Sequence, residues 1–242
     1  MRMTLWMVAA AAATGLPGCT EARSENGGPT IQRSYPVTNF DRIELGGSYD
    51  VIVHTGQKPG VKASGSEKIM ERLVVEVRDG VLVIEPRRTE GFNWKWSDHG
   101  GRVTLDVTVP SLRGAQLGGA GDIRIDTVKG ERFDGGIAGS GDLSVERIEV
   151  NDLTVGITGS GSAKLGGGRV GNAQYEIAGS GGIDAKGVAA EKAAVSIMGA
   201  GNVSANAART AAVSITGSGD VDMTGGAKCT ISKVGSGDVR CS

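Results

Sequence analysis

The sequence predicts an all-β protein, folded as a parallel β-solenoid with about 18–20 residues in each coil. A tripeptide of glycine, a small residue and glycine recurs at spacings of 20 and then 18 residues between Gly119 and Gly237. Apolar and polar residues alternate on both sides of each copy. The chain also has 41 glycines and only 4% aromatic residues, which favours many short strands joined by turns over helices.

The alternation defines two strands in each repeat. Apolar residues occupy the positions four before, four after and six after the first glycine of nearly every copy. The position two before that glycine holds Leu117, Ile137, Ile157, Ile177, Ile197 and Ile215, and Lys233 in the last copy. A period of two is typical of a strand with one buried face. Each repeat is therefore expected to be strand, turn, strand and a looser return loop.

One repeat cannot fold alone. About five buried side chains contribute roughly 10 kcal/mol, whereas ordering the backbone of about twenty residues costs roughly 20 to 40 kcal/mol. Stacking lets each strand pair with its equivalents in the neighbouring coils, about 4.8 Å away, and joins the apolar faces into one core. In-register columns of like residues favour parallel coils over an antiparallel meander.

The turns need glycine for two reasons. A reversal within three residues, directly against an identical turn, requires positive φ angles and minimal side-chain bulk. The turn glycines are Gly119, Gly121, Gly139, Gly141, Gly159, Gly161, Gly179, Gly181, Gly199, Gly201, Gly217, Gly219, Gly235 and Gly237.

An aspartate often follows the turn, as at Asp122 and Asp142. We interpret it as turn chemistry, in which the side chain accepts hydrogen bonds from nearby backbone N–H groups. A calcium ladder is disfavoured because calcium-binding repeats have a period of nine, and because Ser162 and Gly182 interrupt the carboxylates.

The first half of the chain repeats less regularly. "FDRIELGGSYDVIVHTG", residues 40–56, looks like a degenerate strand pair of the same architecture. "RLVVEVRDGVLVIEP" predicts a hairpin around Asp79-Gly80, and "GRVTLDVTVPSL" predicts a strand that ends at Pro110. We expect a single solenoid domain over residues 37–242, with irregular coils over 37–113 and regular coils over 114–242.

The N-terminal segment has the features of an export signal. Residues 1–18 contain Arg2 and an apolar run that is too short to span a bilayer. "LPGC", residues 16–19, resembles a lipobox, which predicts lipidation of Cys19 and attachment to a membrane through the lipid. Thr20 after it favours the outer membrane. Ordinary secretion with a chance cysteine is the alternative. Residues 19–36 are polar and read as the lipidated cysteine and a flexible tether.

One irregular stretch, residues 87–101, concentrates aromatic residues. Phe92, Trp94, Trp96 and Lys95 form a candidate binding patch. The alternative is a loop whose tryptophans pack over the side or the end of the solenoid.

Cys229 and Cys241 remain once Cys19 is assigned to the lipid. Both fall in the last coil, at positions that face inward in earlier copies. A disulfide between them would fasten the end of the solenoid outside the cytoplasm. Two buried thiols are the alternative.

No signature of an enzyme stands out. The only histidines are His54 and His99, and no nucleophile motif is present. Acidic residues lie mostly at turns or on outward strand positions, although a glycosidase-like carboxylate pair cannot be read from spacing alone. We expect no catalytic site, metal or cofactor. The formal net charge of −1 argues against nucleic acid as a partner.

These residues together resemble the putative autotransporter adhesin head GIN domain family over about residues 37–242. The opening "FDRIELGGSYDVIV", the "VPSL" step and the series of "GSGD"-like turns carry the resemblance. It implies a right-handed, pectin-lyase-like β-helix without lyase residues and a role in adhesion, and it supplies no functional residues.

The sequence thus favours an exported, lipid-anchored solenoid that binds a glycan or an envelope or surface protein. Rows of small polar side chains, such as Ser144, Thr154, Ser196 and Ser214, would provide the surface. The alternatives are a structural spacer without a ligand and a carbohydrate-active β-helix enzyme.

Overall fold

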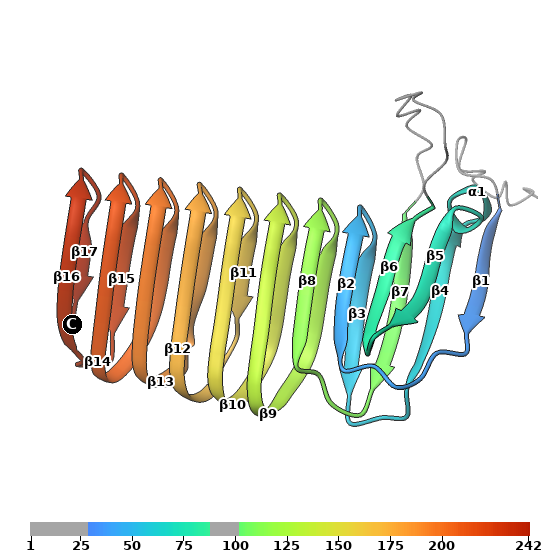
Figure 1. Cartoon of the computed structure of the whole chain (residues 1–242), viewed down its shortest axis with the longest axis horizontal. Helices are drawn as coiled ribbons and strands as arrows, with labels where there is room; N and C mark the ends of the chain where they lie inside the picture. The colour runs from blue at the N-terminus through green and yellow to red at the C-terminus, as the bar shows by residue number, and fades with distance from the viewer. Residues whose placement is uncertain (1–28, 88–101) are drawn as a thin grey trace, which may run out of the picture.

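Each repeat forms one coil of a stacked β-solenoid, as the sequence predicts (Figure 1). The computed structural model describes residues 29–87 and 102–242. We call the strand segments that lead into the turns the pre-turn face, and those that follow the turns the post-turn face. The turns form one long edge, and the chain passes between the faces again at the opposite return edge.

The coils stack in parallel and in register. Leu117 is paired with Ile137, Ile137 with Ile157, and the column continues through Ile177, Ile197 and Ile215, all of them buried. The strands of these coils are β8 (Gly114–Gly119), β9 (Asp122–Gly139), β10 (Asp142–Gly159), β11 (Ser162–Leu165), β12 (Gly168–Gly179), β13 (Gly182–Gly199), β14 (Asn202–Gly217), β15 (Asp220–Thr224), β16 (Lys228–Gly235) and β17 (Val239–Cys241).

The return edge is more regular than a loose loop. In β9, β10, β13 and β14 the strand continues from the post-turn face around this edge to the pre-turn face. Val128, Ile148 and Val188 are buried there and extend the core. The step in period from 20 to 18 residues is absorbed at the same edge, where the pairing of β13 with β14 shifts between Ala185 and Ala189.

The two glycines of each turn serve different purposes. The first has a positive φ, for example 123° at Gly159. The second has no positive φ, but a Cβ at Gly161 would lie 2.4 Å from the carbonyl oxygen of Gly141 in the preceding coil. Backbone hydrogen bonds tie successive turns together, such as Ser160 N–H to Gly139 O at 2.9 Å. Conformation excludes a side chain at the first glycine, and stacking excludes one at the second.

The core is filled by aliphatic columns with two large aromatic residues, Phe133 and Tyr175, both 0% exposed. Phe133 lies in β9 beside Gly135, and Tyr175 in β12 beside Ala173, so small neighbours accommodate the large rings. The Tyr175 hydroxyl has no hydrogen-bond partner among the described residues. Burial raises its pKa above the ordinary value, so the hydroxyl stays neutral.

The first coil does not stand at the end of the stack. The degenerate copy forms β2 (Arg42–Gly47) and β3 (Asp50–Thr55). On one side, β2 and β3 pair in parallel with β8 and β9. On the other side they pair with β6 (Val81–Pro86) and β7 (Val103–Val109). Along the chain, an interior coil therefore comes first, the strands of the N-terminal end follow, and the regular coils come last.

The N-terminal end closes with antiparallel strands and one helical turn. The predicted hairpin is present, with β5 (Leu73–Arg78) antiparallel to β6 and positive φ angles at Asp79 and Gly80. β4 (Gly60–Ser66) is antiparallel to β7, and α1 (Glu67–Met70) follows it and buries Met70. Neither β4 nor α1 was predicted from the sequence.

Part of the predicted tether is a strand. β1 (Thr30–Tyr35) pairs antiparallel with β4, from Thr30 opposite Ser66 to Tyr35 opposite Val61. Residues 30–35 therefore belong to the folded unit, and the prediction of a flexible tether as far as residue 36 is wrong for them. Ile31 and Tyr35 pack against the core, but the exposed Arg33 midway between them breaks the apolar alternation that would predict a strand. Residues 1–28, with Cys19, lie outside the described part.

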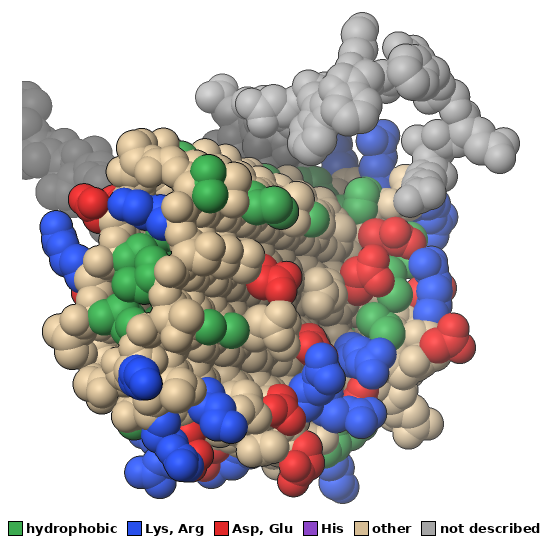
Figure 2. Space-filling model, turned by 60° about the vertical axis from the view of Figure 1, so that its left-hand side comes forward, with side chains coloured by type: hydrophobic (Ala, Val, Ile, Leu, Met, Phe, Trp, Pro, Cys, Tyr) green, Lys and Arg blue, Asp and Glu red, His purple; other side chains and the backbone are tan. Residues whose placement is uncertain are grey.

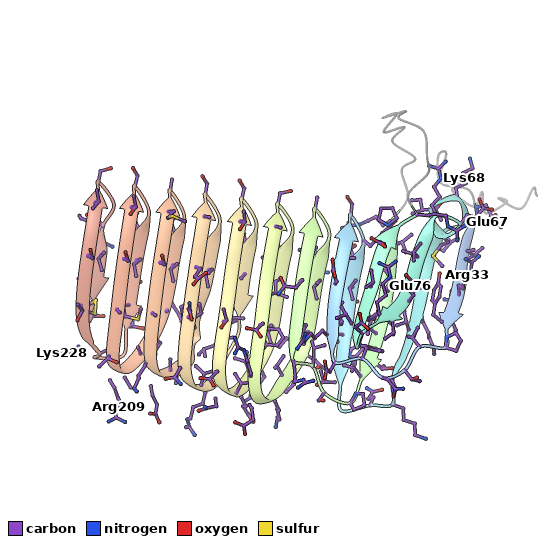
Figure 3. All side chains as sticks on the ribbon, in the orientation of Figure 1. Arg33, Glu67, Lys68, Glu76, Arg209 and Lys228 are labelled. Atoms are coloured by element: carbon purple, nitrogen blue, oxygen red, sulfur yellow. A yellow bond between two sulfur atoms is a disulfide. The ribbon has the colours of Figure 1, made fainter. Side chains whose placement is uncertain are left out.

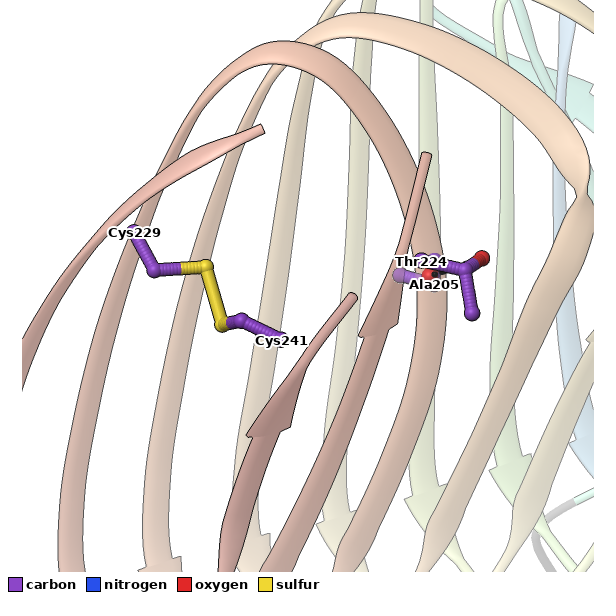
Figure 4. The surroundings of a disulfide bond; sticks show 4 residues. All are labelled: Ala205, Thr224, Cys229 and Cys241. Atoms are coloured by element: carbon purple, nitrogen blue, oxygen red, sulfur yellow. Dashed lines mark hydrogen bonds between the residues drawn. A yellow bond between two sulfur atoms is a disulfide. The ribbon is translucent and has the colours of Figure 1, made fainter. Parts of the chain in front are cut away.

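The last coil carries both remaining cysteines. Cys229 of β16 continues the column of Ala211, and Cys241 of β17 continues that of Met223. A disulfide joins them across the two faces (Figure 4). Lys233 replaces the isoleucine of the earlier coils, and its Nζ donates a hydrogen bond to Gly237 O at 2.6 Å. In the described residues no helix has the length and apolar character needed to cross a membrane.

Candidate functional site

Small side chains cover the pre-turn face of the regular coils. Their backbone alternates in and out, so every second residue of β9, β10, β12, β13, β14 and β16 faces outward. We call the following outward residues the small-residue face: Gly136, Ala138, Thr154, Gly156, Thr158, Ala178, Ala194, Ser196, Ala212, Ser214, Thr216, Thr230 and Ser232. Longer residues interrupt it at Asp134, Gln174, Glu176, Met198 and Val234. Toward the return edge it is bordered by Arg132, Asp152, Asn172 and Lys192.

The small-residue face contains a shallow hollow of about 320 Å³. The outward side chains of Ala194, Ser196, Ala212 and Ser214 form its floor, because short side chains leave the backbone close to the surface. β12 provides one rim, where Gln174 Nε2 donates a hydrogen bond to Glu176 Oε1 at 2.6 Å. An extended chain could lie along this hollow without a steric obstacle between Glu176 and the end of the stack.

Apart from Glu176 on its rim, the hollow is not lined by charged side chains. Figure 2 shows them toward the N-terminal end and along the return edge, with mostly uncharged surface between. Figure 3 places Arg209 and Lys228 at the return edge, and Arg33, Glu67, Lys68 and Glu76 at the N-terminal end. Arg209 is 3.6 Å from Glu191, an exposed pair of the kind that contributes little to stability. The face offers hydrogen bonding and van der Waals contact, with little electrostatic attraction.

The post-turn face differs in character. Its outward residues include Arg124, Lys164, Asp184 and Asp222, and Lys186 Nζ lies 3.0 Å from Asp222 Oδ2. Of the four small polar residues singled out from the sequence, Thr154, Ser196 and Ser214 belong to the small-residue face. Ser144 lies on the post-turn face between Arg124 and Lys164. The expected row of four is therefore split between the faces.

The residues that follow the turns hold the edge together. Asp122 Oδ1 accepts a hydrogen bond from Asp142 N–H at 3.3 Å, and Asp220 Oδ1 accepts one from Asp238 N–H at 2.8 Å. Each side chain thus binds the backbone of the equivalent residue in the next coil, as the turn interpretation predicts. In the described residues, no three His, Cys, Asp or Glu side chains are placed to share a metal ion.

The aromatic candidate patch, Phe92, Trp94, Lys95 and Trp96, lies outside the described residues. The strands on either side of it are described: β6 ends at Pro86, which lies beside Gly47, and β7 begins at Val103.

A polar cluster that was not predicted from the sequence lies between β3 and β9. His54 of β3 lies beside Asp126 of β9, with 3.4 Å between His54 Nδ1 and Asp126 Oδ2. Thr55 N–H and its hydroxyl also donate to Asp126 Oδ1, each at 3.1 Å. The signal was available, because aligning "GGSYD" on the later turns puts Asp50 opposite Asp122, and therefore His54 opposite Asp126.

Similarity to known proteins supports this architecture. The family model described as "Putative auto-transporter adhesin, head GIN domain" matches residues 39–227. No curated protein shows significant sequence similarity to the chain.

Among solved structures, a putative adhesin from Bacteroides fragilis has a TM-score of 0.79 at 24% identity and covers 88% of this chain and 97% of its own. A putative lipid binding protein from Parabacteroides distasonis has a TM-score of 0.70 at 22% identity, and the match covers 90% of this chain and 98% of that protein's chain. A putative adhesin from Parabacteroides merdae reaches 0.69 at 18% identity, again with 90% and 98% covered. At these identities the likeness establishes the fold.

Proposed function

Because the chain belongs to the putative auto-transporter adhesin head GIN domain family, we propose that it is a non-catalytic binding module of the bacterial cell envelope. Its ligand is an extended, uncharged polysaccharide that lies along the small-residue face. The observation that carries the proposal is the hollow of about 320 Å³ floored by alanine and serine side chains. The printed names of the similar structures, adhesins and a lipid binding protein, agree with a binding role.

The chemistry of the face selects among ligand classes. An acidic polymer would need basic side chains along its path, whereas the hollow is lined by none and has Glu176 on its rim; Arg132 and Lys192 lie only at the border toward the return edge. Protein interfaces usually rely on large aromatic or arginine anchors, and these are lacking from the face as well. A neutral polysaccharide suits it because serine and threonine hydroxyls both donate and accept hydrogen bonds, while alanine contacts the apolar ring faces. The regular coil spacing of about 4.8 Å repeats these groups along the ligand.

Blocking the face should abolish binding. In the Ser214→Arg variant a long side chain lies across the hollow between Ser196 and Ser232, and we expect retention on insoluble neutral polysaccharides to fall at least tenfold. The matched control is Ser204→Arg, in the same strand but on the post-turn face between Asp184 and Asp222, which should bind normally. Equal loss in both variants would contradict the proposal.

Other outcomes of the same experiment select the alternatives. Retention of neither the unmodified protein nor the control would favour a structural spacer, and release of soluble sugar would favour a carbohydrate-active enzyme. The Trp94→Ala/Trp96→Ala double variant belongs in the assay too. A loss confined to this variant would move recognition to the segment between β6 and β7.

Anchoring through Cys19 is a further part of the proposal and rests on "LPGC" alone. In bacterial cells we expect the protein to incorporate labelled palmitate and to fractionate with membranes, more specifically with the outer membrane where there is one. Cys19→Ser should remove the label and release the protein from the membrane fraction. Unchanged membrane association without label would argue for ordinary export and a different mode of attachment.

A further inference from the structure

A second cavity lies on the post-turn face, near the N-terminal end. Its volume is about 380 Å³, and it is lined by residues of β1, β3, β4 and β7: Ser34, Tyr35, His54, Gly60, Val61, Lys62, Asp106 and Thr108. Strands that are far apart in the sequence build it, since β1 and β7 both pair with β4. The small-residue face is on the other side of the solenoid, so this cavity is independent of the proposed polysaccharide surface.

Two opposite charges line the cavity but do not form an ion pair with each other. Lys62 and Asp106 stand directly opposite across β4 and β7. Neither forms an ion pair or a hydrogen bond with another residue in the described part of the chain. Both groups therefore remain available to a ligand, and their hydrogen-bonding characters are complementary: the ammonium donates and the carboxylate accepts.

The histidine in the cavity is held in place. Asp126 lies beside His54 Nδ1 at 3.4 Å and is itself fixed by Thr55. A carboxylate at one ring nitrogen favours a proton on that nitrogen and orients the ring, which leaves Nε2 as the free polar atom. Asp126 acts here as a positioning residue, since it does not line the cavity.

Two hydroxyl groups complete the set. Ser34, opposite Lys62, and Thr108, opposite His54, line the cavity from the same side of the sheet. Tyr35 and Val61 are paired with each other on the inward side, where Val61 is only 2% exposed and Tyr35 packs against the core, so their side chains are not offered to the cavity.

We propose that this cavity binds one neutral, hydroxyl-rich ring, such as a hexose unit. An anion would be attracted by Lys62 but repelled by Asp106. A cation would be attracted by Asp106 but repelled by Lys62. A sugar satisfies both, because each of its hydroxyls can donate and accept a hydrogen bond. The cavity volume is within the range typical of sites for small ligands.

The test is saturation-transfer NMR and calorimetry on the full chain with glucose, galactose, mannose and N-acetylglucosamine. Glucuronate and glucosamine serve as the charged comparators. We expect at least one neutral sugar to bind, and Lys62→Ala and Asp106→Ala each to weaken binding at least tenfold. Lys164→Ala, an exposed lysine of β11 on the same face, should bind normally, as should Ser214→Arg.

Two further variants test the details. Ser34→Ala removes only a hydroxyl that lines the cavity and should weaken sugar binding without loss of folding by circular dichroism. Asp126→Asn should weaken binding less than Lys62→Ala does, and it should have no further effect in a chain that already carries His54→Ala, because Asp126 acts through His54. Binding of none of the neutral sugars, tighter binding of a charged comparator, or normal binding by both Lys62→Ala and Asp106→Ala would overturn the proposal.

Discussion

Replacing Gly159 by alanine is expected to lower the free energy of unfolding by about 3 kcal/mol or more. Gly159 has a φ of 123°, a conformation that residues with a Cβ rarely adopt, and the added Cβ would lie 2.4 Å from the carbonyl oxygen of Gly139. Both coils are in the middle of the stack, so neither can move away without breaking contacts on its other side. The midpoint of urea unfolding measures the effect.

The same strand provides the control. Gly156→Ala changes another glycine of β10, but its Cβ would point to open space and its φ is not positive. We expect no loss of stability from this change and a slight gain from the reduced entropy of the unfolded chain. Similar losses in both variants would mean that glycine at the turn is not required by conformation or by stacking.

Truncating Phe133 to alanine is expected to cost about 3 to 5 kcal/mol. Phe133 is 0% exposed and faces inward from β9, where the neighbouring inward position is Gly135. A Cβ at Gly135 would already lie 2.8 Å from Leu143, so the backbone cannot collapse inward to fill the space that the ring leaves. Urea unfolding again gives the measurement.

Glu131→Ala, two residues before Phe133 at an exposed position of the same strand, is the matched control and should leave the unfolding midpoint unchanged. A loss below about 1 kcal/mol for Phe133→Ala would show that the coils repack around the gap. Equivalent positions nearer the C-terminus, Ala193 and Ala211, are already alanine. The cost of large-to-small changes should therefore decrease toward that end of the stack.

The regular coils could be predicted because their signals are local and repeated. Positive φ angles at Gly119 and its equivalents, and an apolar residue two positions earlier, are consequences of one coil's geometry that recur in every copy. The hairpin around Asp79-Gly80 was predictable for the same reason. Stacking then follows from the period alone.

The elements that were missed depend on distant partners. β1 has only Ile31 and Tyr35 as inward residues with an apolar character, and it is ordered by pairing with β4. The place of β2 and β3 inside the stack depends on β6 to β9 together, and no local pattern encodes it. The small-residue face was anticipated only in part, because Ser144 and Thr154 in one strand are on opposite sides of the return edge.

The interior position of the β2 and β3 coil has a consequence for how the chain assembles. Residues 42–55 present two open edges at once, so they can act as a template in both directions. Strands β4 to β7 complete one side before β8 is available, and every later coil then adds to a surface that is already ordered. Assembly can thus proceed from the N-terminus to the C-terminus, coil by coil, as the polypeptide emerges from a ribosome or a translocation channel. No strand of the regular coils needs to wait for a partner that follows it.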